Sequence, residues 1–138
     1  MTAKQYMNRV RRVDKEITAL ENLLQKTRDT LENTTQKYDS DGSQSTKDPH
    51  KFDRLMELES LIDQKISEQL VLKAETLETI GKVRDRTQRI VLTEYYLNMK
   101  TWEQVAVNIN YSYQHTHRIH GHALQEVNRI INGNKEIM

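Results

Sequence analysis

The stretch "TWEQVAVNINYSYQHTHRIHGHAL", residues 101–124, decides the fold of the C-terminal part of the chain. Thr101 precedes a helical pattern and Gln104 follows three residues later, which is the spacing of a capping box. Asn110 can adopt the left-handed conformation that ends a helix, and Ser112 can cap the helix that follows. The stretch therefore predicts a short helix, a turn and a second helix, which together form a helix-turn-helix.

The second helix divides its side chains into a core face and an exposed face when about 100° is allowed for each residue. The residues near the core direction are Thr116, Ile119, His120, Ala123, Val127 and Ile130. The residues on the far side are Gln114, Arg118, Gly121 and His122, with His115 and His117 at the two borders. We therefore expect His120 to be a core histidine and the other three histidines to border an exposed surface.

Four of the five histidines of the chain lie in this stretch, so a metal site must be considered. A helical zinc pair needs two histidines four residues apart, because both imidazoles must reach one ion. No pair of these histidines has that spacing, and the chain has no cysteine. We therefore expect no metal ion and no other cofactor.

The exposed face of the second helix carries groups that DNA-binding helices use. Glutamine can pair with the edge of adenine, and arginine with guanine or with a phosphate. Gln114 and Arg118 supply these groups, and Tyr113 and His115 lie beside them on the first turn. Such a face on an arbitrary helix is usually only solvated, but its position after a capped turn favours contact with DNA.

The N-terminal part carries two long amphipathic patterns. The first keeps a 4-3 alternation typical of a coiled-coil seam through Tyr6, Val10, Val13, Ile17, Leu20, Leu24, Thr27, Leu31, Thr34 and Tyr38. The second follows one broad stripe through Phe52, Leu55, Leu58, Ile62, Ile66, Leu70, Leu77, Ile80 and Val83. The polar residues between them predict a mobile loop at about 39–48.

Two arrangements of these helices remain open from the sequence. Residues 1–82 form either an antiparallel helical hairpin or a parallel coiled coil between two chains through the first helix. In both cases the thin core favours a homo-oligomer, a dimer or higher, assembled through the N-terminal helices. Residues 83–138 then form the helix-turn-helix domain.

Composition agrees with an all-α fold and excludes several classes of function. The chain is 36% hydrophobic and 30% charged, with four glycines and one proline. Residues 1–82 hold 14 Lys/Arg and 15 Asp/Glu, whereas residues 83–138 hold 7 and 5, so the second part is mildly basic. No apolar run approaches the roughly 20 residues of a membrane span. We therefore expect no membrane partner and a cytoplasmic location.

No sequence feature indicates an enzyme. A carboxylate pair, a nucleophile with its base and a glycine-rich phosphate loop are all missing from the pattern. The expected function is therefore binding rather than catalysis.

The segment Ile90–Val127 resembles region 4 of bacterial sigma factors. It is still more similar to small phage proteins of Gram-positive hosts, including late-transcription regulators of the RinA and ArpU type. The similarity is carried by "TWEQVA" in the first helix, by Ser112 after the turn and by the pair Ala123-Leu124.

The resemblance implies a phage-encoded regulator of late genes that acts in the cytoplasm of a bacterial host cell. Its partners would be double-stranded DNA and host RNA polymerase. The family's DNA-contacting positions fall on Tyr113, Gln114, His115, His117 and Arg118. We add His122 on the same surface, and Arg84, Arg86 and Arg89 as phosphate contacts from a neighbouring helix. The alternative is a protein–protein adaptor that binds a host factor such as RNA polymerase through its coiled coil.

Overall fold

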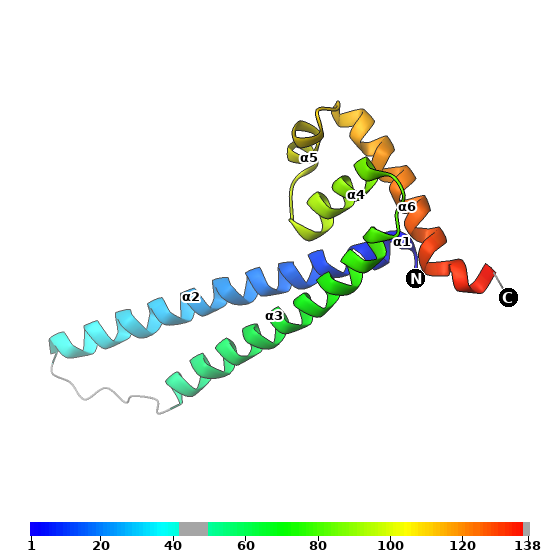
Figure 1. Ribbon diagram of the computed structural model, residues 1–138. Helices are drawn as coiled ribbons and strands as arrows, with labels where there is room; N and C mark the ends of the chain where they lie inside the picture. Colours follow the sequence, from blue (N-terminus) through cyan, green and yellow to red (C-terminus); the bar gives the residue numbers. More distant parts are fainter. Residues whose placement is uncertain (42–49, 137–138) are drawn as a thin grey trace. The chain divides into compact units, whose positions relative to one another are not determined.

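The computed structural model describes residues 1–41 and 50–136, and these residues form helices with no strand (Figure 1). The helices are α1 (Ala3–Met7), α2 (Arg9–Asp41), α3 (Lys51–Gly81), α4 (Arg86–Leu92), the π-helical η1 (Thr93–Leu97), α5 (Trp102–Ile109) and α6 (Tyr113–Glu136). The prediction of an all-α fold is confirmed. Part of the predicted loop was wrong, because residues 39–41 still belong to α2; the rest of it, residues 42–48, lies outside the described residues.

The chain divides into two compact units, residues 13–68 and residues 1–12 together with 69–138. The limits of these units differ from the predicted boundary between residues 82 and 83. Ala3, Met7 and Ile80 belong to the same buried cluster as Leu92 and Val127. The reason is that the C-terminal helices have too little apolar surface to close a core alone, so α1 and the end of α3 complete it.

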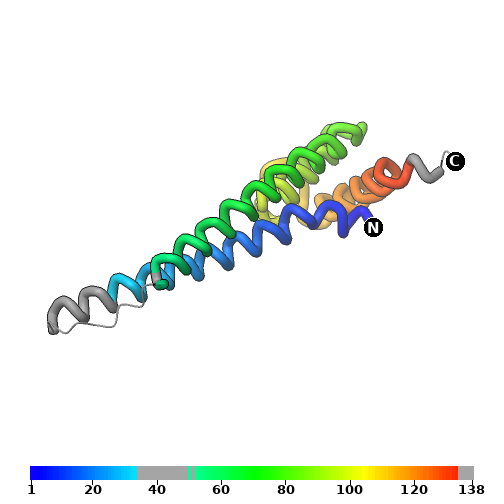
Figure 2. The backbone as a smooth tube through the Cα atoms, turned by 90° about the horizontal axis from the view of Figure 1, so that it is seen from below, coloured from blue at the N-terminus to red at the C-terminus, as the bar shows by residue number. Residues whose placement is uncertain are grey.

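The unit of residues 13–68 is a pair of antiparallel helical segments from α2 and α3 (Figure 2). Its buried apolar side chains are Val13, Ile17 and Ile62. Two ion pairs link the segments: Lys65 Nζ lies 2.9 Å from Glu16, and Arg28 Nη2 lies 2.6 Å from Glu59. Each exposed ion pair contributes at most about 1 kcal/mol to folding. These two pairs therefore matter more for the register between α2 and α3 than for the stability of the hairpin. The hairpin is thus formed within one chain.

The second unit is built around α6, on which α1, α4 and α5 pack (Figure 1). Its cluster of buried side chains contains Ala3, Met7, Ile80, Val83, Leu92, Tyr96, Ala123 and Val127. Thr2 and Gln5 cap α1 reciprocally, and the Tyr6 hydroxyl lies 2.7 Å from Thr79 Oγ1 on α3. These polar contacts fix how the short α1 enters the core.

The sequence of residues 82–99 continues the helical pattern after Gly81, but the structure interrupts this helix. After Leu92 the backbone widens into η1, where the Asn98 N–H donates to the Thr93 carbonyl at 3.0 Å, five residues back. Met99 then takes a left-handed conformation at φ 59°. The wide turn changes the phase of the helix, so Tyr96 is buried while Tyr95 projects toward α5.

Leu92→Ala should destabilise the protein by about 2–5 kcal/mol, because it leaves a cavity in a closed core. Ile90 is the matched control: it is two residues away and 40% exposed. Ile90→Ala should cost less than about 1 kcal/mol. Urea unfolding followed by circular dichroism measures both values, and equal losses would show that Leu92 is not in the core.

Candidate nucleic-acid interface

The short helix, the turn and the second helix expected from residues 101–124 form with the predicted local contacts. Thr101 Oγ1 accepts from the Gln104 N–H at 3.2 Å, and the Thr101 N–H donates to Gln104 Oε1 at 2.9 Å. Asn110 lies in the left-handed region at φ 61° and ψ 38°. Ser112 Oγ accepts from the His115 N–H at 3.0 Å. Both helix ends at the turn are therefore held by side chains or by a left-handed residue.

Buried side chains of α5 and α6 hold the two helices together on either side of the turn. Val105 and Ala106 of α5 are buried, as are Thr116, Ala123 and Val127 of α6. The Thr116 hydroxyl donates to the Ser112 carbonyl at 2.8 Å, which satisfies a polar group that burial would otherwise leave unpaired. The predicted core face of the second helix is confirmed at its three central positions.

The opposite face of α6 is exposed as expected. The predicted contact residues that are exposed there are Tyr113, Gln114, His115, Arg118 and His122. The ring of Tyr111, from the turn, stacks on His115 with centroids 4.5 Å apart. This stacking limits the rotamers of His115, so the first turn of α6 presents a partly ordered aromatic surface with one fixed cation, Arg118.

His117 departs from the predicted exposed border. It is half-buried, with its ring centroid 4.7 Å from Trp102 and 4.5 Å from Tyr113. Its Nε2 atom is buried and has no hydrogen-bond partner among the described residues. The helical periodicity of α6 alone could not predict that His117 is half-buried, because the residue that covers its ring, Trp102, belongs to α5.

His120 is the core histidine that the wheel predicts, although it is half-buried rather than enclosed. Its Nε2 lies 2.6 Å from the Tyr96 hydroxyl. Burial, and then the neighbouring His117 and Lys4, lower the pKa of His120 to about 4, and burial raises the pKa of Tyr96. At neutral pH the imidazole is therefore uncharged, and the Tyr96 hydroxyl donates to Nε2.

An aromatic cluster that the sequence analysis did not identify surrounds these two histidines. Tyr95 stacks on Trp102 at 3.9 Å and 15°, and the Arg11 guanidinium lies 4.1 Å from the Tyr95 ring. The cluster borders a cavity of about 230 Å³ lined by Lys4, Asn8, Tyr95, Tyr96, Trp102, His117 and His120. The single tryptophan of the chain, Trp102, was the sequence feature from which this cluster could have been suspected. Its effect is to lock the angle between α5 and α6.

The three arginines proposed as phosphate contacts differ in their surroundings. Arg84 and Arg86 are exposed, whereas Arg89 is half-buried and donates from Nη1 to the carbonyls of Val83 and Arg84, both at 2.8 Å. Arg89 thus holds the chain between α3 and α4, and this role limits it as a phosphate contact.

Arg84 lies away from the first turn of α6. The pKa of Glu126 is lowered by its hydrogen bond with Arg129 and, to a smaller extent, by the charge of Arg84. Glu126 is thirteen residues after Tyr113, which is about 20 Å along a helix. Arg84 therefore belongs near the middle of α6, and it does not extend the surface formed by Gln114 and Arg118.

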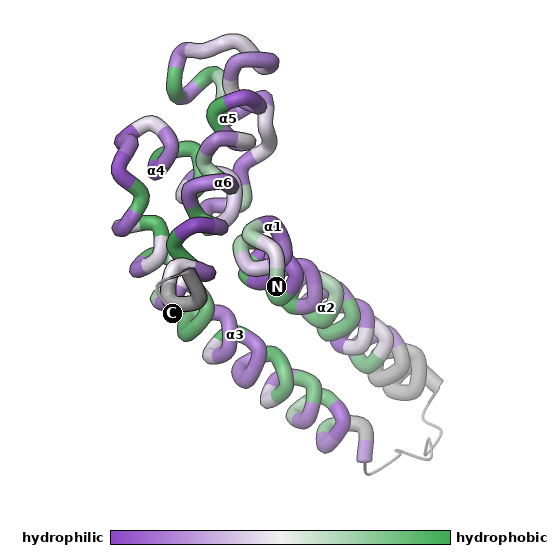
Figure 3. The backbone as a smooth tube through the Cα atoms, turned by 90° about the vertical axis from the view of Figure 1, so that its right-hand side faces the viewer, coloured by the Kyte–Doolittle hydropathy of each residue, from purple (hydrophilic) through white to green (hydrophobic). Residues whose placement is uncertain are grey.

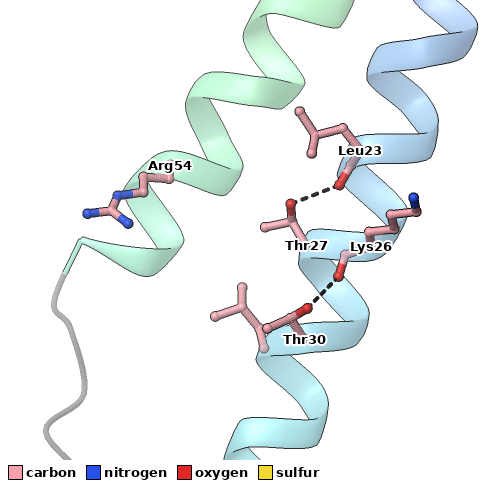
Figure 4. A pocket seen from close by; sticks show the side chains of 6 residues that line it. Leu23, Lys26, Thr27, Thr30 and Arg54 are labelled. Carbon is pink, nitrogen blue, oxygen red and sulfur yellow. Dashed lines mark hydrogen bonds between the residues drawn. The ribbon is translucent and has the colours of Figure 1, made fainter.

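The hairpin unit has a groove of its own, of about 370 Å³, shown in Figure 4. It is lined by Leu23, Lys26, Thr27, Thr30, Leu31 and Arg54. The hydroxyls of Thr27 and Thr30 donate to the carbonyls of Leu23 and Lys26, at 2.8 and 2.9 Å. The two threonine hydroxyls are therefore already used within α2, and the remaining polar side chains among the described residues that line the groove are Lys26 and Arg54.

Among the described residues, no three His, Cys, Asp or Glu side chains converge as metal ligands. The described helices also include none that is long and apolar enough to cross a membrane. No protein-family model matches the chain, and no curated protein or solved structure shows significant similarity to it.

The low pKa of His120 makes stability depend on pH. Above the ordinary histidine pKa of 6.5 the ring is neutral in both the folded and the unfolded chain, so it has no effect. Below 6.5 the unfolded chain takes up the proton first, so stability falls as the pH decreases toward about 4. Full burial would make this about 3 kcal/mol, and partial exposure reduces our expectation to about 1–2 kcal/mol.

The measurement is urea unfolding at pH 7 and pH 4.5, compared with His120→Gln, which keeps a hydrogen-bonding group beside Tyr96 but does not titrate. The wild-type chain should lose about 1–2 kcal/mol more than this variant over that interval. His122→Gln, at an exposed position, should behave as the wild type does. An equal acid loss in His120→Gln and wild type would contradict the assignment.

Proposed function

We propose that the protein is a DNA-binding transcriptional regulator encoded by a phage, and that its α5–turn–α6 segment resembles sigma factor region 4 in function as well as in pattern. The observation that carries the proposal is the exposed face of α6 directly after a doubly capped turn. Gln114 and Arg118 lie there beside Tyr113 and His115. In this arrangement the first turns of α6 enter the major groove and α5 crosses the DNA backbone.

The surroundings of each side chain decide its role in this proposal. Arg118 reads guanine or binds a phosphate, Gln114 reads adenine, and the Tyr113 and His115 rings contact thymine methyl groups or sugars. His122 lies two turns further along and faces the backbone of the DNA. His117 positions Tyr113 and Trp102 rather than contacting a base, since its Nε2 is already buried.

Arg118→Ala should weaken binding to the preferred DNA sequence by about tenfold or more, since one bidentate arginine contact contributes about 1–3 kcal/mol. The preferred duplex is first selected from a random-sequence pool, and affinity is then measured by fluorescence anisotropy. Lys82→Ala removes the same charge from an exposed residue outside the helix-turn-helix and should change affinity less than threefold. Equal affinity of Arg118→Ala and wild type would contradict the proposal.

The salt dependence should be shallow for a DNA-binding protein. Arg89 is tied to two carbonyls and Arg84 lies near Glu126, so few cations remain for phosphates. We expect the plot of log K against log salt concentration to have a slope of about −1 to −3, corresponding to one to three phosphates. The measurement is the same anisotropy titration between 50 and 200 mM KCl. A slope steeper than about −6 would mean that another basic surface binds the DNA.

An adaptor that binds host RNA polymerase is the second candidate, and one observation favours it. Val107 is 74% exposed on α5, and Tyr111 and Tyr113 are about half exposed around the turn, which gives this surface an apolar and aromatic character. Aromatic side chains of this kind are enriched at protein interfaces. Surface plasmon resonance with purified polymerase holoenzyme, using wild type and Val107→Ser, separates the two: loss of polymerase binding with DNA binding intact would favour the adaptor.

A further inference from the structure

Helix α3 carries a second apolar stripe that the hairpin does not use. Its large exposed apolar residues on this stripe are Phe52, Met56, Ile66, Leu70 and Leu77. With Glu59, Asp63 and Lys73 they follow a 4-3 alternation, which is the seam of a coiled coil. The side chains that pack in the hairpin, such as Ile62, lie on a different face. Figure 3 shows hydrophobic and hydrophilic residues alternating along α3.

The exposed apolar residues of the stripe are spaced too regularly to be apolar residues scattered over a surface. α3 runs without interruption from Lys51 to Gly81, so the heptad positions keep their register along it. Leu70 is 62% exposed and Leu77 is 55% exposed, although leucines at seam positions are normally covered. A sustained apolar stripe on a helix indicates a missing partner helix.

The charges within the stripe specify one partner and one orientation. In a parallel in-register pair of α3 helices, Asp63 would face Asp63 and Lys73 would face Lys73 of the other copy. In an antiparallel pair centred on Glu68, Asp63 faces Lys73 of the second copy, and Lys73 faces Asp63. The same register places Ile66 opposite Leu70 twice, between the two ion pairs. Outside the ion pairs it places Leu77 opposite Glu59, whose carboxylate is already paired with Arg28 of its own hairpin. Shifting this pair by one heptad in either direction sets a charged residue against Ile66 or Leu70.

Small residues flank the stripe at the point where the two helices would cross. Ser60, Ser67 and Ala74 recur every seven residues beside it, and all three are exposed. In the antiparallel register Ser67 lies next to Ser67 of the second copy, and Ser60 next to Ala74. Small side chains at these positions let two helix backbones approach closely, so the surface suits a helix of the same chain.

We propose that the exposed stripe of α3 is a homodimer interface, in which α3 of a second copy packs antiparallel about a two-fold axis at Glu68. The helices overlap from Glu59 to Leu77, over about 28 Å. Such a contact is smaller than a standard protein interface, so the dimer is weak, with a Kd on the order of 100 µM or somewhat tighter. This inference does not depend on DNA binding.

The ion pairs give a charge-swap test. Asp63→Lys should place two like-charge pairs in the dimer and raise its dissociation constant at least tenfold, and Lys73→Asp should do the same. The double variant with both changes restores opposite charges and should return the constant to within threefold of wild type. Sedimentation velocity between 10 and 500 µM, without DNA, measures all four proteins. Leu61→Ser, an exposed α3 residue away from the stripe, is the control and should dimerise as wild type does.

Cross-linking tests the orientation separately, because the natural chain has no cysteine. Ser67→Cys should form cross-linked dimers with a short bismaleimide, since the two positions meet at the two-fold axis. Ser60→Cys alone should not, but a mixture of Ser60→Cys with Ala74→Cys should. A chain that stays monomeric to 500 µM overturns the proposal, as does a folded double swap that fails to restore association. Cross-linking of Ser60→Cys with itself would indicate a parallel pair.

Discussion

Burial of the apolar face of α6 is the constraint on which the C-terminal unit depends. Ala123 and Val127 are fully buried, yet α5 covers only the beginning of the helix. The rest of the cover comes from α1, from the end of α3 and from α4, which lie far apart in the sequence. Because this one face needs all of them, the compact unit includes both ends of the chain.

The aromatic cluster converts that packing into a defined surface. Trp102 stacks on Tyr95 and contacts both His117 and His120, so α5 cannot rotate about α6 without breaking ring contacts. The neutral His120 accepts from Tyr96 at the base of the cluster, where a charged ring would be costly. The exposed first turn of α6 is therefore held from beneath, which is the preorganisation that the proposed contact with DNA requires.

The low charge of this surface affects both proposed functions. A single arginine among aromatic and amide side chains provides weak attraction for phosphates, so specificity must come from contacts to base edges or to a protein. A weak dimer through α3 would compensate, because two linked modules bind neighbouring half-sites far more tightly than one. The two proposals rest on different observations, but the proposed dimer would increase the affinity of the proposed DNA contact.

The sequence by itself determined the local structure around the turn. Thr101, Gln104, Asn110 and Ser112 act through contacts within three to five residues, so their spacing was sufficient to predict helix ends and the turn. The buried positions Thr116, Ala123 and Val127 followed from helical periodicity for the same reason. The hairpin was one of two arrangements that the sequence left open. An apolar seam predicts that a helix packs against another helix, but it does not determine whether that helix belongs to the same chain.

Only the tertiary structure decided what depends on contacts between distant segments. Trp102 covers His117 from a neighbouring helix, and Arg89 turns back to the carbonyls of Val83 and Arg84, so neither role could be read from a wheel. The π-helical turn at η1 shifted the phase that buries Tyr96. Met7, Ile80 and Val127 belong to one buried cluster, so the C-terminal unit includes residues from before the predicted boundary. Periodicity could not show this, because it describes one helix at a time, whereas burial depends on all the neighbouring segments.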